Sequence, residues 1–318
     1  MLPLTIWHYP FRYAAAQFRR GNPIRKISIA AIKGLRKFSA EMPASVTDVR
    51  PLDAPHLSFA PTDSMVITAV YWFGIRGYEG IMSEIWKGLC ANSTSVLEIG
   101  ANVGFFSVLG ANERPKHYAA VEPLPHVAEI LRMNLLRNGL GFVEVIEGAA
   151  VPSYETENVQ ISVPDEGHKA PVGSHLMSGI ELSDRSQMEI LSVRAYPVVS
   201  LVEGRDLIKI DAEGIEAQLL IAARDQILRH KPTLVIEVLP EAENLGATLR
   251  EIAISAGYSI YIVPEFGSDT LVSVAPQEFS SKTPQRFNSK DVMLSLSDPQ
   301  QLKLQFSGWP VSVQSLRQ

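Results

Sequence analysis

The sequence VLEIGANVGFFS, residues 96–107, indicates the fold most clearly. The apolar run at its start is typical of a short buried strand, and residues 105–111 suit a helix. Between them, Gly100 allows a sharp turn, and Gly104 allows the helix to approach the sheet closely. A strand, a tight glycine turn and a helix together bring backbone N–H groups up to a nucleotide-like ligand. The stretch therefore predicts either such a ligand-binding turn or a plain strand-to-helix connection.

The turn differs from the dinucleotide-binding fingerprint GxGxxG. That fingerprint would need glycines at positions 102 and 105, where Asn102 and Phe105 stand instead. An acid, Glu98, lies two residues before the first glycine. A carboxylate at that place suits a ligand with a cationic amine or sulfonium better than a pyrophosphate. These residues argue against a nucleotide-cofactor oxidoreductase, which stays as an alternative.

A second candidate ligand is Glu122, at the end of the strand predicted over residues 118–121. It follows Gly104 by about 18 residues. An acid at this distance, on the tip of the neighbouring strand, reaches ribose hydroxyls in nucleotide-binding α/β folds. By itself Glu122 could be a surface acid, but together with the glycine turn it predicts ribose binding. No basic residue stands directly at this tip, which argues against a 2′-phosphate.

The chain alternates strands with helices from residue 95 onward. Strands are predicted at 95–99, 118–121, 142–146, 206–210, 233–238 and 258–263, and helices at 105–111, 125–137, 214–228 and 242–255. This alternation predicts an α/β fold with a parallel sheet and helices on both faces. Residues 152–205 interrupt it as a long insertion, with strand-like pieces at 158–163 and 190–199, and insertions of this length commonly carry function.

Composition excludes several classes of protein. Hydrophobic residues make up 46% and charged residues 20%, which supports a sizeable core. The net charge of −5 argues against a protein-wide nucleic-acid surface, so no nucleic-acid partner is expected. The single cysteine, Cys90, cannot form an internal disulfide, and no Cys/His metal-ligand set is present. A reducing compartment, the cytoplasm, fits this cysteine usage.

The N-terminal segment has a different charge from the rest. Residues 1–40 contain eight basic residues and no acidic ones, and residues 24–38 have the spacing of a basic amphipathic helix. This helix either packs on the main domain or contacts a membrane surface or another anionic partner. Residues 43–63 are rich in proline and predict a linker. We therefore divide the chain into a basic extension and linker, 1–60, and one domain, 61–318.

Three motifs occur in the order known from one protein family. They are EIGANVGFFS at 98–107, VEP at 121–123 and IKIDAEGIE at 208–216. Over about residues 78–296 the chain resembles the FkbM-type family of S-adenosylmethionine-dependent methyltransferases. The resemblance implies a Rossmann-like sheet of seven strands that is mostly parallel, with one antiparallel strand beside the sixth, for which residues 292–296 are the candidate.

The same resemblance implies a cofactor and a reaction. The cofactor would be S-adenosylmethionine, and the reaction O-methylation of a hydroxyl on a sugar, a glycan or another small molecule. A methyltransferase-like binding protein without turnover stays as an alternative. The cofactor-binding residues would be Glu98, Gly100, Asn102, Gly104 and Glu122.

Asp211 and Glu237 are the first candidates for catalysis. Asp211 ends the fourth strand and Glu237 lies near the end of the fifth, and in the family's sheet these strands are neighbours. Both carboxylates should then face the crevice at the carboxyl ends of the strands. Methyl transfer requires a positioned acceptor oxygen and removal of its proton. Asp211 would either abstract this proton, or position the cofactor or cap the following helix.

His175 and His168 are the next base candidates. Both lie in the insertion, which could fold over the crevice and bring a base to it. A histidine in such a loop can equally be a plain surface residue. Asp211 and Glu237 alone are too few ligands for a divalent ion, so no metal site is expected.

Overall fold

The computed structural model describes residues 42, 44–153, 157–164, 175–176, 188–239, 242–264 and 268–315. The basic helix predicted over residues 24–38 and the base candidate His168 lie outside these ranges. Within them, no helix combines the length and apolar character that crossing a membrane requires.

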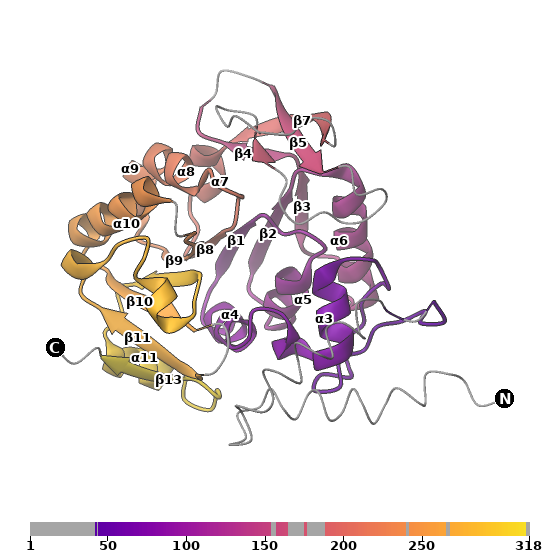
Figure 1. Ribbon diagram of the computed structural model, residues 1–318, viewed down its shortest axis with the longest axis horizontal. Helices are drawn as coiled ribbons and strands as arrows, with labels where there is room; N and C mark the ends of the chain where they lie inside the picture. The colour runs from indigo at the N-terminus through magenta and orange to yellow at the C-terminus, as the bar shows by residue number, and fades with distance from the viewer. Residues whose placement is uncertain are drawn as a thin grey trace.

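A mixed sheet forms the centre of the molecule. Its strands are β1 (Ser95–Ile99), β2 (His117–Glu122), β3 (Glu144–Glu147), β8 (Leu207–Ile210), β9 (Thr233–Glu237), β10 (Ser259–Val263), β11 (Thr270–Val274), β12 (Asp291–Ser295) and β13 (Ser312–Ser315). Across the sheet they lie in the order β13-β11-β10-β12-β9-β8-β1-β2-β3 (Figure 1). The neighbouring strands from β3 to β9 pair in parallel, and β12 lies antiparallel between β9 and β10. The predicted α/β class, and the antiparallel strand near residues 292–296, are confirmed.

The expected number of strands is wrong: the sheet has nine strands, not seven. Strand β11 turns back antiparallel on β10, and β13 joins β11 in parallel, so β12 is not the only strand that runs against the main direction. The reason lies in the C-terminal residues, for which the sequence indicates only one strand. Leu271 of β11 and Val313 of β13 are buried together with Leu302 of α11 (Pro299–Gln305), so these residues extend the core beyond β10.

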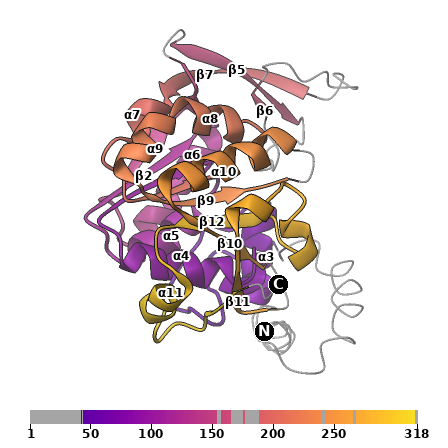
Figure 2. The same cartoon turned by 90° about the vertical axis from the view of Figure 1, so that its left-hand side faces the viewer.

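Helices cover both faces of the sheet, as predicted. One face carries α3 (Met65–Phe73), α4 (Met82–Ala91), α5 (Phe105–Asn112), α6 (Pro125–Arg137) and α11. The other carries α7 (Val198–Val202), α8 (Glu216–Ala222), α9 (Arg224–His230) and α10 (Glu243–Ala256). Figure 2 shows the second group gathered on one side of the sheet, edge-on, with α3, α4 and α5 on the other. Buried side chains form one hydrophobic cluster on each face.

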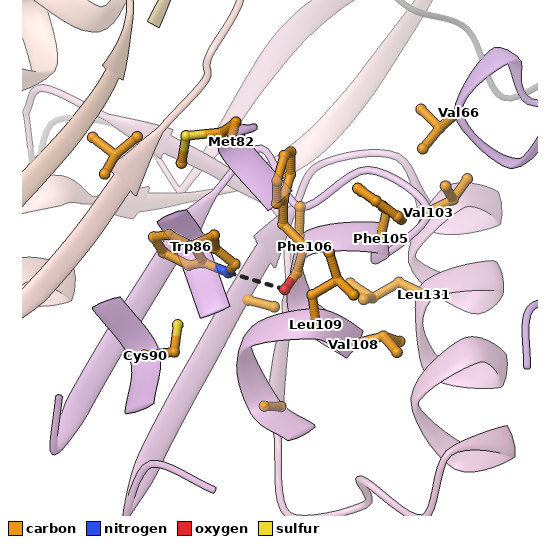
Figure 3. Close-up of a cluster of buried hydrophobic side chains, with 14 of the residues drawn as sticks. Val66, Met82, Trp86, Cys90, Val103, Phe105, Phe106, Val108, Leu109 and Leu131 are labelled. Atoms are coloured by element: carbon orange, nitrogen blue, oxygen red, sulfur yellow. Dashed lines mark hydrogen bonds between the residues drawn. The ribbon is translucent and has the colours of Figure 1, made fainter. Parts of the chain in front are cut away.

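Helix α5, which follows the glycine turn, is held firmly against α4. The Trp86 indole N–H donates a hydrogen bond to the Phe106 carbonyl oxygen at 3.0 Å, and both side chains lie in the same buried cluster (Figure 3). The helices approach closely at Gly110, where a Cβ would come within 2.7 Å of the Cys90 sulfur. This packing fixes the start of α5, and with it the turn that leads from β1 into the helix.

The insertion forms a second sheet, with contributions from β4 (Ala149–Val151), β5 (Asn158–Pro164), β6 (His175–Leu176) and β7 (Met188–Pro197). The two strand-like pieces predicted from the sequence correspond to β5 and β7, which pair antiparallel. Ile161, Val163 and Val193 join the main hydrophobic cluster, so this sheet packs on the domain through one face.

Part of the proline-rich segment predicted as a linker packs into the domain. Val49 and Phe59 pair through their backbones, and both are fully buried. The side chain of Asn134 in α6 accepts a hydrogen bond from the Ala60 backbone N–H at 2.7 Å. The residues from about 46 to 60 therefore contribute to the core next to α6.

Candidate functional site

A cavity lies where β1, β2, β8 and β9 end, at the carboxyl edge of the central sheet. Gly100, Asn102, Glu122, Asp211 and Glu237 all line it, so the structure brings these five predicted residues together. This convergence follows from the strand order, because parallel neighbours present their carboxyl ends at the same edge.

The two histidine candidates are placed differently. His175 lies in β6, where its backbone pairs with Ser162 of β5. The neighbouring Ile161 of β5 lines the cavity, so His175 lies one strand beyond this part of the cavity wall. His168 lies outside the described residues, and its role as a base stays a prediction.

Gly100 is required by the contact between β1 and β8. Its φ is +81°, and a Cβ at this position would lie 1.8 Å from the carbonyl oxygen of Asp211. The Asp211 backbone N–H in turn donates to the Ile99 carbonyl oxygen at 3.0 Å. The glycine turn and the backbone of the catalytic candidate Asp211 are therefore in direct contact.

Glu122 has the geometry of a ligand for hydroxyl groups. One carboxylate oxygen accepts the Asn102 backbone N–H at 2.8 Å, and the other accepts the Leu124 N–H at 3.0 Å. Burial raises the pKa of Glu122 to about 7, although these two hydrogen bonds counteract it. A carboxylate offers about four lone-pair positions, so the two backbone donors leave room for hydroxyls from a ligand.

Glu98 and Gly104 belong to the same turn but do not line the cavity. The Glu98 carboxylate is fully buried, and one of its oxygens accepts hydrogen bonds from the Ser107 and Tyr118 hydroxyls, each at 2.6 Å. It thereby connects β1 to α5 and β2. At Gly104 a Cβ would lie 2.4 Å from the Leu131 side chain, so this glycine allows α5 to approach α6. Both residues support the turn from outside the cavity.

Replacing Glu98 by glutamine should flatten the pH dependence of stability. Burial raises the pKa of Glu98 from 4.5 to about 7, so between these values the folded state binds more protons than the unfolded state. The free energy of unfolding of the wild type therefore falls as the pH rises through this interval. The Glu98→Gln variant lacks this loss, while its amide oxygen can still accept from Ser107 and Tyr118.

Between about pH 5 and 8 we expect the wild type to lose on the order of 1 to 3 kcal/mol of unfolding free energy that Glu98→Gln does not lose. Urea unfolding at several pH values between about 5 and 8 measures the difference. Glu129→Gln, on the exposed side of α6, is the matched control and should leave the pH dependence unchanged. A Glu98→Gln variant that follows the wild-type curve would contradict this account.

Asp211 is held in its ionised form by a buried lysine. Lys209 Nζ lies 2.8 Å from Asp211 Oδ2, and the lysine side chain is only 2% exposed. Burial opposes ionisation of Asp211, but Lys209, Lys290 and a hydrogen bond with Glu237 outweigh it and lower the pKa of Asp211. Asp211 does not cap α8: no side chain caps that helix.

The turn after β8 is stabilised by hydrogen bonds from its backbone N–H groups to a glutamate side chain. Glu216, in the first turn of α8, accepts the backbone N–H groups of Ala212 and Gly214 at 2.9 and 3.0 Å. The loop that carries Asp211 is thus held by hydrogen bonds within the domain.

The pKa of Glu237 is shifted in the opposite direction to that of Asp211. Burial, followed by the nearby negative charge of Asp211, raises the pKa of Glu237 to about 8, while Lys290 counteracts both. As a pair, the two carboxylates therefore hold a proton to a higher pH than an isolated carboxyl group would. Among the described residues, no group of three or more His, Cys, Asp or Glu side chains is arranged to hold a metal ion.

Sequence reasoning missed several residues of the cavity wall. Lys209 is inside one of the quoted motifs, but its position in the strand indicates a structural side chain. Tyr78 and Lys290 also line the cavity, although neither belongs to any of the three sequence motifs. Ile161, in the insertion, lines it as well. For Ile161 the sequence offered one indication, the length of the insertion, and this length did not identify Ile161 itself.

The comparisons with known proteins agree with the motifs. A model of the methyltransferase FkbM domain matches residues 98–260, just over half of the chain. The chain belongs to the FkbM methyltransferase family. The matched range contains the glycine turn, Glu122, Asp211 and Glu237, and S-adenosylmethionine is the cofactor that this family membership assigns. A search of curated protein sequences finds no match.

Solved structures similar to this FkbM-family chain include two methyltransferases and a fibrillarin. A methyltransferase FkbM from Methylobacillus flagellatus is 17% identical with a TM-score of 0.39, and the alignment covers 64% of this chain and 44% of that one. An O-methyltransferase from Bacillus cereus in complex with SAH is 13% identical, with a TM-score of 0.36 and coverages of 68% and 80%. A fibrillarin from Aeropyrum pernix with natively bound S-adenosyl-L-methionine is 14% identical, with a TM-score of 0.33 and coverages of 63% and 65%. This chain thus spans less than half of the first structure.

Proposed function

We propose that this FkbM-family protein transfers a methyl group from S-adenosylmethionine to a hydroxyl oxygen of a sugar, a glycan or another small molecule. The observation that carries the proposal is the shared cavity, which Glu122, Asp211 and Glu237 all line. The acid that would bind the ribose and the pair that would accept the proton therefore line one space.

The residues present fit the cofactor. Glu122 would accept the ribose hydroxyls with the lone pairs that Asn102 and Leu124 leave free. Val127, Ala150 and Ile161 give the cavity an apolar wall that suits a flat base. Asp211 lines the same cavity together with Lys209, the lysine that balances its charge. Glu98 and Gly104 would act on binding through the shape of the turn.

The chain's own residues would then manage the acceptor. When bound, the cofactor supplies a methyl group on a cationic sulfur, so activation of a leaving group is not required of the protein. The protein must position the acceptor hydroxyl and receive its proton. Asp211, kept ionised by Lys209, is the first candidate to receive it, with Glu237 beside it. His175 and His168 stay as the next candidates.

Cofactor binding can be tested by calorimetry with S-adenosylhomocysteine and with NAD. We expect the protein to bind S-adenosylhomocysteine and not NAD. The Glu122→Gln variant should bind S-adenosylhomocysteine about 10- to 100-fold more weakly, because a hydrogen bond to a charged group contributes about 1.5–3 kcal/mol. Glu129→Gln, on the exposed side of α6, should bind like the wild type. Absence of binding in the wild type, or undiminished binding in Glu122→Gln, would refute the assignment.

A further inference from the structure

Lys290 lies in the cavity wall between two acids that come from distant parts of the chain. Its Nζ is 2.5 Å from Glu237 Oε1 and 3.2 Å from Glu79 Oε1. Glu79 precedes α4 and is buried, Glu237 ends β9, and Lys290 directly precedes β12. The ammonium group donates a hydrogen bond to Glu237, whereas its contact with Glu79 is an ion pair without hydrogen-bond geometry.

Other charged groups surround Glu237 from each neighbouring element. Lys209 lies in β8 and Asp211 directly follows this strand. Asp291, at the start of β12, is buried. Tyr78 and Glu79 act on Lys290 from the segment before α4. Within this set, Lys209 forms its ion pair with Asp211, and Lys290 forms its shortest ion pair with Glu237.

We propose that Lys290 is a positioning residue that holds Glu237 beside Asp211 and determines whether this carboxylate pair carries a shared proton. The inference rests on the proposed function, because the shared proton affects catalysis only if the pair receives the acceptor's proton. Two carboxylates in contact cannot both ionise at low cost, so a nearby cation decides how many protons they hold.

The division of Lys290 between two acids has a clear chemical effect. With Glu79 also bound, the ammonium stabilises the charge of Glu237 less than it would in an exclusive pair. Burial and then the charge of Asp211 raise the pKa of Glu237 to about 8, and the contact with Lys290 limits this rise. A general base works best when it titrates near the working pH, because it is then both available and strong enough. Lys290 and Glu79 together would set this balance.

Infrared difference spectroscopy can follow this proton without a known acceptor. Burial also raises the pKa values of Glu98 and Glu122, to about 7, so the band of Glu237 is identified as the protonated-carboxyl band that is missing in Glu237→Gln. In a titration from about pH 6 to 10, the wild type should lose this band with a midpoint near 8. In Lys290→Met the midpoint should rise by at least about one pH unit, because the stabilising charge is gone. Lys290→Arg should restore it to within about half a unit.

A second variant tests the same idea with the opposite sign. Glu79→Gln removes the competing carboxylate, so Lys290 should act more strongly on Glu237 and the midpoint should fall. This variant keeps the test decisive if Lys290→Met does not fold. Lys282→Met is the matched control, since Lys282 is exposed and lies 3.8 Å from Glu243. It should leave the midpoint unchanged.

The outcomes separate the two proposals. An unchanged midpoint in folded Lys290→Met, or in Glu79→Gln, overturns the role of Lys290. Binding of S-adenosylhomocysteine, measured by calorimetry on the same samples, reports on the proposed function independently. Shifted midpoints without such binding would support the role of Lys290 in the pair and overturn the proposed function instead.

Discussion

Asp211→Asn should lower methyl transfer by about 10²- to 10⁴-fold, the usual contribution of a general base. Asparagine has nearly the same size as aspartate but cannot take up the proton of an acceptor hydroxyl. The assay is transfer of labelled methyl from S-adenosylmethionine to a panel of glycosides and other hydroxylated small molecules. The binding of S-adenosylhomocysteine should change much less than turnover.

The buried pair with Lys209 requires a control, because Asp211→Asn leaves this ammonium without its counter-charge. Breaking a buried pair costs about 3–5 kcal/mol, which could lower activity through unfolding alone. The double variant Asp211→Asn with Lys209→Met removes both charges, and we expect it to regain stability but not turnover. If Asp211→Asn turns over normally and His175→Ala or His168→Ala does not, the base comes from the insertion. If all three single variants turn over at normal rates, none of these side chains is the base, and the acceptor loses its proton to water.

Gly100→Ala should cost more than about 4 kcal/mol of unfolding free energy, or prevent folding altogether. The new methyl group would lie 1.8 Å from the Asp211 carbonyl oxygen, at a φ of +81° that disfavours any side chain. Relieving the clash would separate the ends of β1 and β8, which pair along their length. Urea unfolding, followed by circular dichroism, measures the loss.

Gly257→Ala is a close control for the backbone effect. Gly257 ends α10 with a φ of +79°, but a Cβ there would meet no atom within 4 Å. Its replacement should cost only about 1 to 2 kcal/mol, the price of the left-handed conformation. Equal costs at both positions would show that the contact with Asp211 is not decisive. A bulkier variant such as Gly100→Val would also clash with the Asp211 carbonyl oxygen. If this variant loses ligand binding, the loss therefore has two causes, the disturbed backbone and the blocked approach of the ligand.

Local spacing is enough to predict much of this fold. Alternating strands and helices imply the parallel order, and this order brings Glu122, Asp211 and Glu237 to one edge, since the position of a strand end follows from its neighbours. The number of strands is less predictable. Strands β11 and β13 form because they cover apolar surface beyond β10, which is a property of the assembled sheet.

The sequence does not predict in which direction the side chains at the site point. Glu98 stands two residues before Gly100, yet its carboxylate turns toward Ser107 and Tyr118, away from the cavity. Lys290 is far from every motif and reaches Glu237 only because β12 inserts beside β9. Such contacts between distant segments leave no periodic pattern in the sequence.

The hydrogen bonds of Glu216 affect the kind of ligand that the turn after β8 can accept. In phosphate-binding loops, successive N–H groups at the start of a helix remain open for an anion. Here the chain's own carboxylate already occupies the corresponding place, because it accepts the N–H groups of Ala212 and Gly214. A phosphate group would have to compete with a tethered anion for these two donors. The backbone donors of Ala212 and Gly214 in this turn are therefore already used within the chain.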